Sequence, residues 1–427
     1  MRLLLITYYF PPCGGAAVQR WLKWLPELVA NGFEVTVLTT LDGDYPVRDE
    51  SLLSTIPPQV KVIRVAAPRW EKTWKTLAGD KSALPYGSLS QASKSGVIKR
   101  TLVWLRLNLI IPDLRKFWNP QAFKAAVKLL HVQPMDIVIT TGPPHSTHLL
   151  GLKLKQRCKA KWVADWRDPW TTIHYLQLNP PAPLAMRIHR RLERRVAENS
   201  DLNITVSEHL AKHLPGRRNV TIYNGFDARQ FERLAETEPL KEMDKVFRLK
   251  YVGSVTEGQD LETMLRTISE AFNGIAFEIV FVGTKLDLTQ KALLERYMPG
   301  RYSVKGFAAH AGAVLEMRSA NVLLLLINYY PGAEGMLTTK LFEYLATGVK
   351  ILCLGPKGGE AEKLIRSYEA GSCFDRDEQA EATEYLRGLY NSWQRGEDIS
   401  NHRDISVLSS QNQALKLIEE LRALKSD

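Results

Sequence analysis

The sequence contains only four cysteines, and they do not cluster. Cys13, Cys158, Cys353 and Cys373 are far apart in the chain and form no CxxC or cysteine–histidine motif. Structural zinc sites need closely spaced ligands, and disulfide-stapled folds need many cysteines in a short chain. The sequence therefore argues against a zinc site and a disulfide framework, and it fits a reducing cytoplasm. We expect no metal and no cofactor.

Long apolar runs are also missing. No segment approaches the roughly 20 apolar residues that span a membrane. The apolar stretch 3–10 is too short for a signal peptide and is broken by Pro11 and Pro12. The 427 residues, 45% of them hydrophobic and 24% charged, have the size and composition of two ordinary globular domains.

Acidic residues are fewer than basic ones, and the net charge is +11. Anionic substrates, anionic lipid and nucleic acid could each explain it, as could a basic surface with no partner. Nucleic acid fits least, because the basic residues are scattered and no recognisable nucleic-acid-binding motif is present. Two segments favour lipid. Residues 97–111 are apolar with interspersed lysine and arginine, which suits either an interfacial helix or a core helix. Residues 186–198 predict a helix with five arginines, either a solvated face or a contact with lipid head groups.

Apolar strands alternate with helices in both halves of the chain. The first half opens with a strand over 3–8, a glycine-containing turn and a helix over 18–31, followed by a strand over 34–39. Gly14 and Gly15 lie in the turn, which lacks the GxGxxG pattern. The second half repeats the alternation, with strands over 247–252, 277–282, 321–327 and 349–354. This pattern predicts two parallel sheets and an α/β fold. We interpret Asp42-Gly43-Asp44 as a turn rather than a metal motif.

The stretch 331–360 predicts a ligand site in the second half. A buried strand is followed by a glycine-containing loop, a short helix that begins near Thr338 or Thr339 and ends at Gly348, and another strand. A helix N-terminus at the carboxyl edge of a parallel sheet suits phosphate. Lys340 adds a cation, and Glu343 can accept hydrogen bonds from sugar hydroxyls. The alternative is an ordinary βαβ unit with a solvated lysine and glutamate.

Two segments of the first half also follow predicted strands. His145 comes after Gly142-Pro143-Pro144, and the hexapeptide 165–170 combines Asp165, Arg167 and Asp168 with two tryptophans. A structural ion pair would explain one aspartate and the arginine, but it explains the whole group less well. We therefore favour a site at the carboxyl edge of the first sheet.

Three motifs resemble those of glycosyltransferase family 4, which has the GT-B fold. They are YYFPP-x-GG over 8–15, D-x-RDPW over 165–170 and TKLFEYLA over 339–346, and together they extend over nearly the whole chain. The resemblance implies two Rossmann-like domains, residues 1–225 and 226–400, that face each other across a cleft. It implies that a C-terminal helix in 401–427 packs back on the first domain. The family retains anomeric configuration and usually needs no metal.

The resemblance also implies roles for individual residues. The predicted donor-binding residues are Gly14, Gly15, Gly253, Ser254, Lys340, Leu341 and Glu343, of which Glu343 is expected to hold the nucleotide ribose. The predicted acceptor-side residues are Asp165 and Arg167. The predicted catalytic residues are His145, Asp168 and Glu334, and we assign Asp168 to positioning the acceptor or the sugar before a role as general base.

The sequence departs from the family pattern at two points. The first glutamate of the donor motif falls on Gly335, with Glu334 one residue early. The usual arginine and lysine on the donor phosphates are replaced by Ser254 and Glu257. Both departures put more weight on Lys340.

The sequence thus predicts a hexosyltransferase that moves sugar from a nucleotide-sugar to a saccharide or lipid-linked acceptor in polysaccharide or glycoconjugate biosynthesis. We expect a cytoplasmic protein that attaches to the inner face of a membrane. A GT-B epimerase or hydrolase and an inactive sugar-nucleotide-binding protein are the alternatives.

Overall fold

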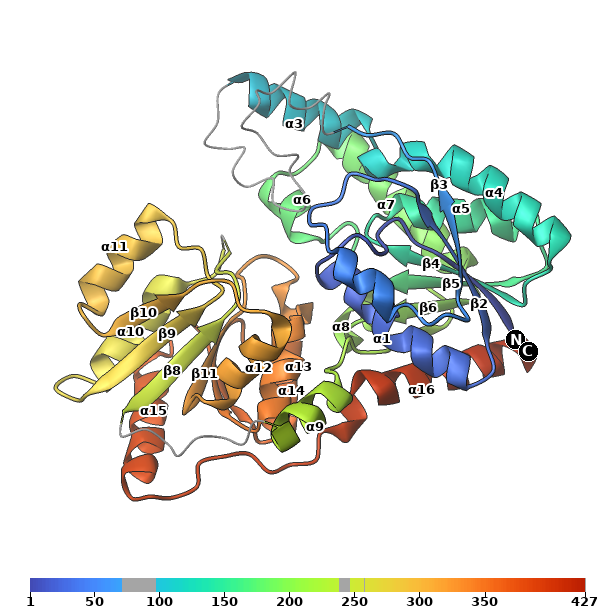
Figure 1. Cartoon of the computed structure of the whole chain (residues 1–427). Coiled ribbons are helices and arrows are strands. Elements are labelled where there is room, and N and C mark those ends of the chain that lie inside the picture. Colours follow the sequence, from blue (N-terminus) through green and yellow to red (C-terminus); the bar gives the residue numbers. More distant parts are fainter. Residues whose placement is uncertain (71–96, 238–245, 257, 427) are drawn as a thin grey trace. The chain divides into compact units, whose positions relative to one another are not determined.

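The computed structural model describes residues 1–70, 97–237, 246–256 and 258–426 (Figure 1). They divide into two compact units, Met1–Tyr223 with Ser410–Asp427, and Asn224–Ser409. Each unit is built on one parallel sheet, which confirms the predicted α/β fold.

The first unit has a seven-stranded sheet in the order β3-β2-β1-β4-β5-β6-β7. Its central strands β1, β4 and β5 are buried along almost their whole length because helices cover both faces of the sheet. The strands are β1 (Arg2–Ile6), β2 (Glu34–Thr40), β3 (Lys61–Val65), β4 (Ile137–Gly142), β5 (Lys161–Trp166), β6 (Leu202–Thr205) and β7 (Asn219–Thr221).

Helices α1 and α16 pack on one face of this sheet, and α4, α5 and α7 pack on the other. The helices and 3-10 helices of the unit are α1 (Ala16–Ala30), η1 (Glu50–Thr55), α3 (Val97–Leu109), η3 (Leu114–Trp118), α4 (Asn119–Val132), α5 (Ser146–Lys155), α6 (His174–Leu178), α7 (Pro183–Asn199), α8 (Glu208–His213) and α16 (Ser410–Ser426).

Helix α16 joins the first unit although it comes from the end of the chain. Its residues Leu417 and Leu421 are buried in the same core as α1. Polar contacts hold its outer side: Arg422 donates to the carbonyl of Asn31 at 3.1 Å, and Glu420 pairs with Arg218 at 2.8 Å. The two chain ends consequently lie close together (Figure 1).

The second unit has a six-stranded sheet in the order β10-β9-β8-β11-β12-β13. In both sheets the order reverses once, between β1 and β4 in the first and between β8 and β11 in the second. Such switch points are where open α/β sheets bind ligands. The strands are β8 (Phe247–Val252), β9 (Phe277–Val282), β10 (Tyr302–Lys305), β11 (Val322–Leu326), β12 (Lys350–Leu354) and β13 (Gly371–Phe374).

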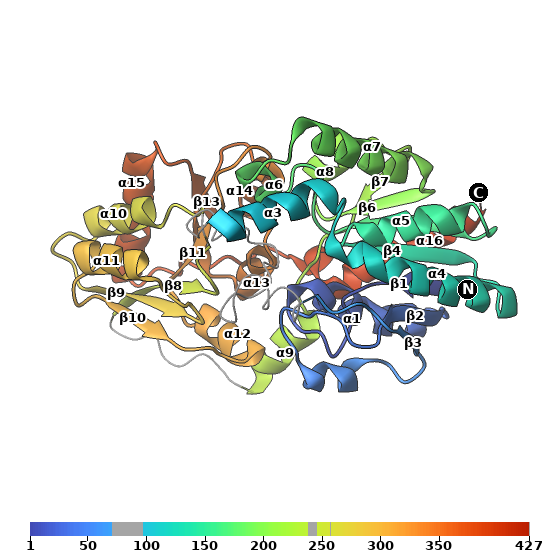
Figure 2. The ribbon, with the colours of Figure 1, turned by 90° about the horizontal axis from the view of Figure 1, so that it is seen from above.

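Helices α10, α11 and α15 form the core on one face of the second sheet, and α12, α13 and α14 lie on the other (Figure 1, Figure 2). The helices and 3-10 helices are α9 (Ala228–Thr237), α10 (Leu261–Ala271), α11 (Leu288–Tyr297), α12 (His310–Arg318), η4 (Ala333–Gly335), α13 (Thr339–Thr347), α14 (Glu360–Ser367), α15 (Gln379–Gln394) and η5 (Ser406–Leu408).

Candidate functional site

The candidate site lies at the switch point of the second sheet, where β8 and β11 are neighbours. Gly253 follows β8 with a φ of +104°, a conformation that favours glycine. Helix α13 follows β11 and carries Lys340 in its first turn. A Cβ atom at Gly253 would lie 3.2 Å from Cδ of Lys340. Two residues predicted to bind the donor, from segments that follow different strands, therefore lie close together.

The Lys340 ammonium is partly buried against an aromatic ring. Its Nζ donates to the hydroxyl of Tyr251 at 2.8 Å and lies 4.2 Å from the centroid of that ring. Burial lowers the pKa of Lys340 to about 8, although the charge of Glu343 opposes this shift. Lys340 forms no ion pair with any residue that the structure describes, and Glu343 pairs with His310 instead. A charge with so little compensation favours an anionic ligand.

Thr338 gives a second free polar group at the start of α13. It occupies the N-cap position at the predicted start of the helix, although its side chain makes no capping hydrogen bond. Its hydroxyl oxygen is buried and has no hydrogen-bond partner within the described chain. The first turn of α13 contains no acidic residue. The hydroxyl, the helix dipole and Lys340 together suit a phosphate group.

Glu343 is held in place by a histidine that the sequence analysis missed. One carboxylate oxygen lies 2.7 Å from Nε2 of His310 on α12, and Nδ1 of His310 lies 2.7 Å from Oε1 of Gln230 on α9. The contact crosses 33 residues of sequence, so no local motif points to it. The role of Glu343 toward a ribose stays a prediction.

Two further residues of the predicted donor motif differ in exposure. The Leu341 side chain is fully buried, and its backbone N–H donates to the carbonyl of Thr338. This placement favours packing over donor contact. Glu334 is exposed in η4, and a Cβ at Gly359 would lie 3.2 Å from its backbone oxygen. Ser254 is exposed and accepts a hydrogen bond from Tyr251 through its carbonyl. Glu257 lies outside the described residues.

The glycine turn of the first unit leads directly into α1. Gly15 stands at the N-cap with a φ of +86°, and a Cβ at Gly14 would lie 3.1 Å from Cβ of Asp49. The turn itself therefore favours glycine at position 15 and leaves little room for a side chain at position 14. Their contact with the donor stays a prediction.

Asp165 is a core residue and not an exposed acceptor contact. Its side chain is 0% exposed and accepts hydrogen bonds from Nε1 of Trp21 and from the hydroxyl of Thr141, both at 2.9 Å. Arg20 of α1 completes the group at 3.3 Å. The structural ion pair considered for this hexapeptide is present, but its arginine is Arg20 rather than Arg167. This arrangement corrects the predicted acceptor-side role of Asp165, because all its neighbours come from the protein core.

Arg167 and Asp168 lie just beyond the buried end of β5. The Arg167 guanidinium donates to the carbonyl of Pro143 on the neighbouring loop. Asp168 is exposed. Of the two aspartates in the hexapeptide, only Asp168 is placed to meet a ligand, and its acceptor role stays a prediction.

His145 lies beneath the surface at the start of α5. It is 3% exposed and stacks on Trp170 with ring centroids 5.2 Å apart. Burial lowers its pKa to about 3, so the imidazole is neutral at pH 7. Neighbouring His148 is fully buried and shares a hydrogen bond with Thr140. A neutral imidazole suits hydrogen bonding more than proton donation, and direct catalysis by His145 would need rearrangement around Trp170.

The Asp42–Asp44 turn is held by protein contacts. Asp42 pairs with Arg48 and Arg69, each at 2.7 Å. Buried Asp44 accepts a hydrogen bond from the backbone N–H of Trp70 at 2.8 Å. These contacts give both carboxylates a structural role.

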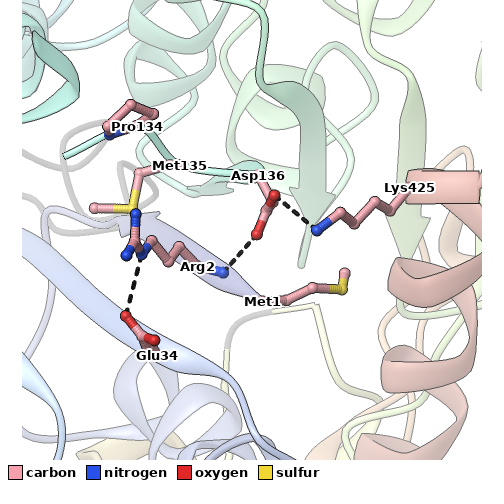
Figure 3. Close-up of a pocket in the computed structure, with 7 residues that line it drawn as sticks. All are labelled: Met1, Arg2, Glu34, Pro134, Met135, Asp136 and Lys425. Carbon is pink, nitrogen blue, oxygen red and sulfur yellow. Dashed lines mark hydrogen bonds and ion pairs between the residues drawn. The ribbon is translucent and has the colours of Figure 1, made fainter.

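A hollow of about 310 Å³ lies at the amino ends of β1, β2 and β4 (Figure 3). Its charged side chains point toward one another: Arg2 pairs with Glu34 at 3.3 Å and Lys425 with Asp136 at 2.9 Å. Ligands of open α/β sheets bind at the opposite, carboxyl edge. We therefore assign this hollow to the attachment of α16 and not to catalysis.

Helices α3 and α7 present apolar and basic side chains on the first unit. On α3, Trp104 is 54% and Leu109 67% exposed, while Val103 of the same helix is buried. On α7, Leu184 is 70% exposed, and the five predicted arginines are all exposed. The side chain of Asn108 accepts from the backbone N–H of Ala182 at 2.7 Å and links the two segments. No helix in the described chain is long and apolar enough to cross a membrane.

Comparison with known proteins finds a family model that matches part of the chain. Residues 14–225 match the family described as a glycosyl transferase 4-like domain. No protein with curated annotation matches the sequence.

Solved structures resemble the whole chain and establish the GT-B fold. Sucrose-phosphate synthase from Thermosynechococcus elongatus superposes with a TM-score of 0.62 at 16% identity, covering 100% of this chain and 99% of that one. A glycosyltransferase from Rickettsia africae gives 0.63 at 12% identity, covering 99% and 98%. HepE from Anabaena, in complex with UDP-glucose, gives 0.60 at 13% identity, covering 99% and 100%.

Proposed function

We propose that this chain, with its glycosyl transferase 4-like domain and GT-B fold, is a hexosyltransferase that uses a nucleotide-sugar donor. The observation that carries the proposal is the close approach of Lys340 and Gly253 at the switch point of the second sheet, together with the buried Thr338 hydroxyl at the start of α13. A partly buried cation without an ion pair in the described chain, a glycine beside it and a helix N-terminus are features that suit a diphosphate. The UDP-glucose bound to HepE has this chemistry.

In the proposed mechanism the second unit holds the donor. Lys340 and the start of α13 stabilise the negative charge that develops on the departing diphosphate. Glu343 receives the ribose hydroxyls, and His310 fixes its orientation. Transfer proceeds with retention and without a metal, as the family resemblance implies. The leaving phosphate takes the proton of the acceptor hydroxyl, and Asp168 positions the acceptor.

The proposed acceptor is a saccharide or a lipid-linked sugar in polysaccharide or glycoconjugate assembly. Anionic lipid would bind the arginines of α7, and the exposed side chains of α3 would enter the interface. Docking of this kind places the enzyme and a lipid-linked acceptor on one surface. The proposed location of the enzyme is therefore the cytoplasmic face of a membrane.

A thermal-shift screen with nucleotide-sugars, UDP-glucose included, tests donor binding, since a tight ligand raises the melting temperature by mass action. Radiolabelled donor is then incubated with lipid and saccharide acceptors, with and without EDTA. Label in the acceptor supports transfer, and a loss with EDTA contradicts the metal-free mechanism. Label in a changed nucleotide-sugar or in free sugar indicates an epimerase or a hydrolase. Binding without turnover indicates an inactive binding protein.

A further inference from the structure

Two of the four cysteines meet in the second sheet. Cys353 on β12 and Cys373 on β13 are directly paired in the register of these parallel strands. Their sulfur atoms are 3.2 Å apart. Both are free thiols, and neither Cys13 nor Cys158 contributes to the pair. The sequence gives no sign of this contact because the two residues are 20 positions apart and only strand register brings them together.

The backbone geometry suits a bond between the two sulfurs. Neighbouring strands are about 4.8 Å apart, which lies within the range of about 4.4–6.8 Å between the Cα atoms of disulfides. Paired residues in register project to the same face of a sheet. Closing the sulfur separation to about 2.05 Å therefore needs a small side-chain movement and no shift in register.

Access to the pair is asymmetric. β13 is an edge strand, and Cys373 is partly exposed, whereas Cys353 is fully buried. The contact with Cys373 and burial raise the pKa of the Cys353 thiol well above its usual range. Cys373 is therefore the sulfur that a small molecule reaches first, and Cys353 is the internal partner.

We propose that Cys353 and Cys373 form a reversible dithiol–disulfide site that reacts with small-molecule disulfides of the glutathione type. The Cys373 thiolate attacks one sulfur of the oxidant, forms a mixed disulfide and releases one thiol. The Cys353 thiolate then attacks the Cys373 sulfur and releases the second thiol. The protein gains one S–S bond and loses two hydrogen atoms, and the oxidant is reduced to two thiols.

The bond would act on the loop after β12, where a Cβ at Gly359 would lie 3.2 Å from the backbone oxygen of Glu334. β12 runs directly into the glycine-rich segment 355–359. Gly355 donates to the carbonyl of Phe374 at 3.0 Å, and the backbone N–H of Lys357 contacts Asp375. A bond between Cys353 and Cys373 would hold the ends of β12 and β13 together just before this segment. It would also close a covalent loop and limit the unfolded chain, which raises stability.

The test uses the full chain with oxidised and reduced glutathione at a series of ratios. Intact mass should show the loss of two hydrogen atoms, and peptide mapping should find a Cys353–Cys373 bond that dithiothreitol removes. The melting temperature should rise by several degrees in the oxidised form. Cys373→Ser, at the more exposed position, should abolish the bond, while Cys158→Ser should leave it intact.

Three results would overturn the proposal: unchanged mass at every ratio, glutathione adducts that persist without an internal bond, or the same bond formed only after denaturation. None of these measurements uses a nucleotide-sugar. The redox site and the proposed transferase activity are therefore tested independently of each other.

Discussion

At the scale of single residues, Lys340 has opposite effects on stability and on binding. Its ammonium is partly buried with the Tyr251 hydroxyl as partner, so it lowers the stability of the free protein. The same feature prepares the site for a diphosphate. Sites that trade stability for ligand binding in this way are common in enzymes.

Lys340→Met should weaken nucleotide-sugar binding about 10- to 100-fold, the usual effect of losing a hydrogen bond to a charged group. The same variant should gain about 1–3 kcal/mol in unfolding free energy at pH 7, because the buried charge is gone. Isothermal calorimetry and chemical denaturation measure the two effects. Lys291→Met, at an exposed position on α11, is the matched control. Equal donor affinity in both variants would remove Lys340 from the site.

The pKa of Lys340 also predicts a pH dependence. Below pH 8 the ammonium is charged and can bind the diphosphate; as pH rises through about 8, the free protein loses this proton. Donor affinity should therefore fall above pH 8. The dissociation constant is measured from pH 6.5 to 9.5. Lys340→Met should give a flat profile, and a wild-type profile that is equally flat would contradict the assignment.

Asp165 and Asp168 give a matched pair for separating structure from function. Asp165→Asn leaves Arg20 buried without its countercharge and should cost about 3 kcal/mol of stability. Asp168→Asn, at an exposed position, should change stability by no more than about 0.5 kcal/mol. Denaturant titration of both variants measures these two changes in stability. Transfer kinetics of Asp168→Asn test its predicted acceptor role, which normal kinetics would exclude.

At the scale of elements, the contact between α12 and α13 sets the orientation of Glu343. His310→Ala removes the hydrogen bond to Glu343 and leaves the carboxylate free to rotate. We expect weaker donor binding by about 3- to 10-fold, in line with one hydrogen bond of about 1 kcal/mol, and little change in turnover. His310→Gln can still donate to Glu343 and should restore part of the affinity. If His310→Ala binds donor as the wild type does, Glu343 needs no such support.

The elements themselves follow from local sequence, whereas many contacts between them do not. Apolar runs and glycine stops mark strands such as β11 and β12, and the helix from Thr339 to Thr347 lies where the pattern predicts it. The charged hexapeptide predicts a site at Asp165, because nothing in its sequence shows that Arg20 and Trp21 contact this side chain. The contact of His310 with Glu343 and the Cys353–Cys373 contact could not be predicted for the same reason. Packing and strand register, rather than neighbouring residues, create those contacts.

At the scale of the whole molecule, the net charge of +11 suits an anionic binding partner. In the first unit, basic residues of α7 adjoin exposed apolar residues of α7 and α3. The side chains of Arg187, Arg190, Arg191, Arg194 and Arg195 are all exposed, so their charges can meet an anionic surface. A basic side chain contributes about 1 kcal/mol near an anionic membrane.

We expect the protein to sediment with vesicles that contain anionic lipid and to do so less as salt rises, because the Debye length falls from about 10 Å at 0.1 M to about 3 Å at 1 M. Insertion of Trp104 and Leu109 would leave a salt-resistant fraction, which Trp104→Ser should reduce. Arg190→Gln with Arg194→Gln should weaken binding at low salt. Lys124→Gln with Lys128→Gln on α4 removes the same charge from another exposed helix and should have less effect. Equal losses in the two double variants would mean that net charge alone drives the attraction. Equal sedimentation with neutral and anionic vesicles, or none with either, would exclude electrostatic docking through α7.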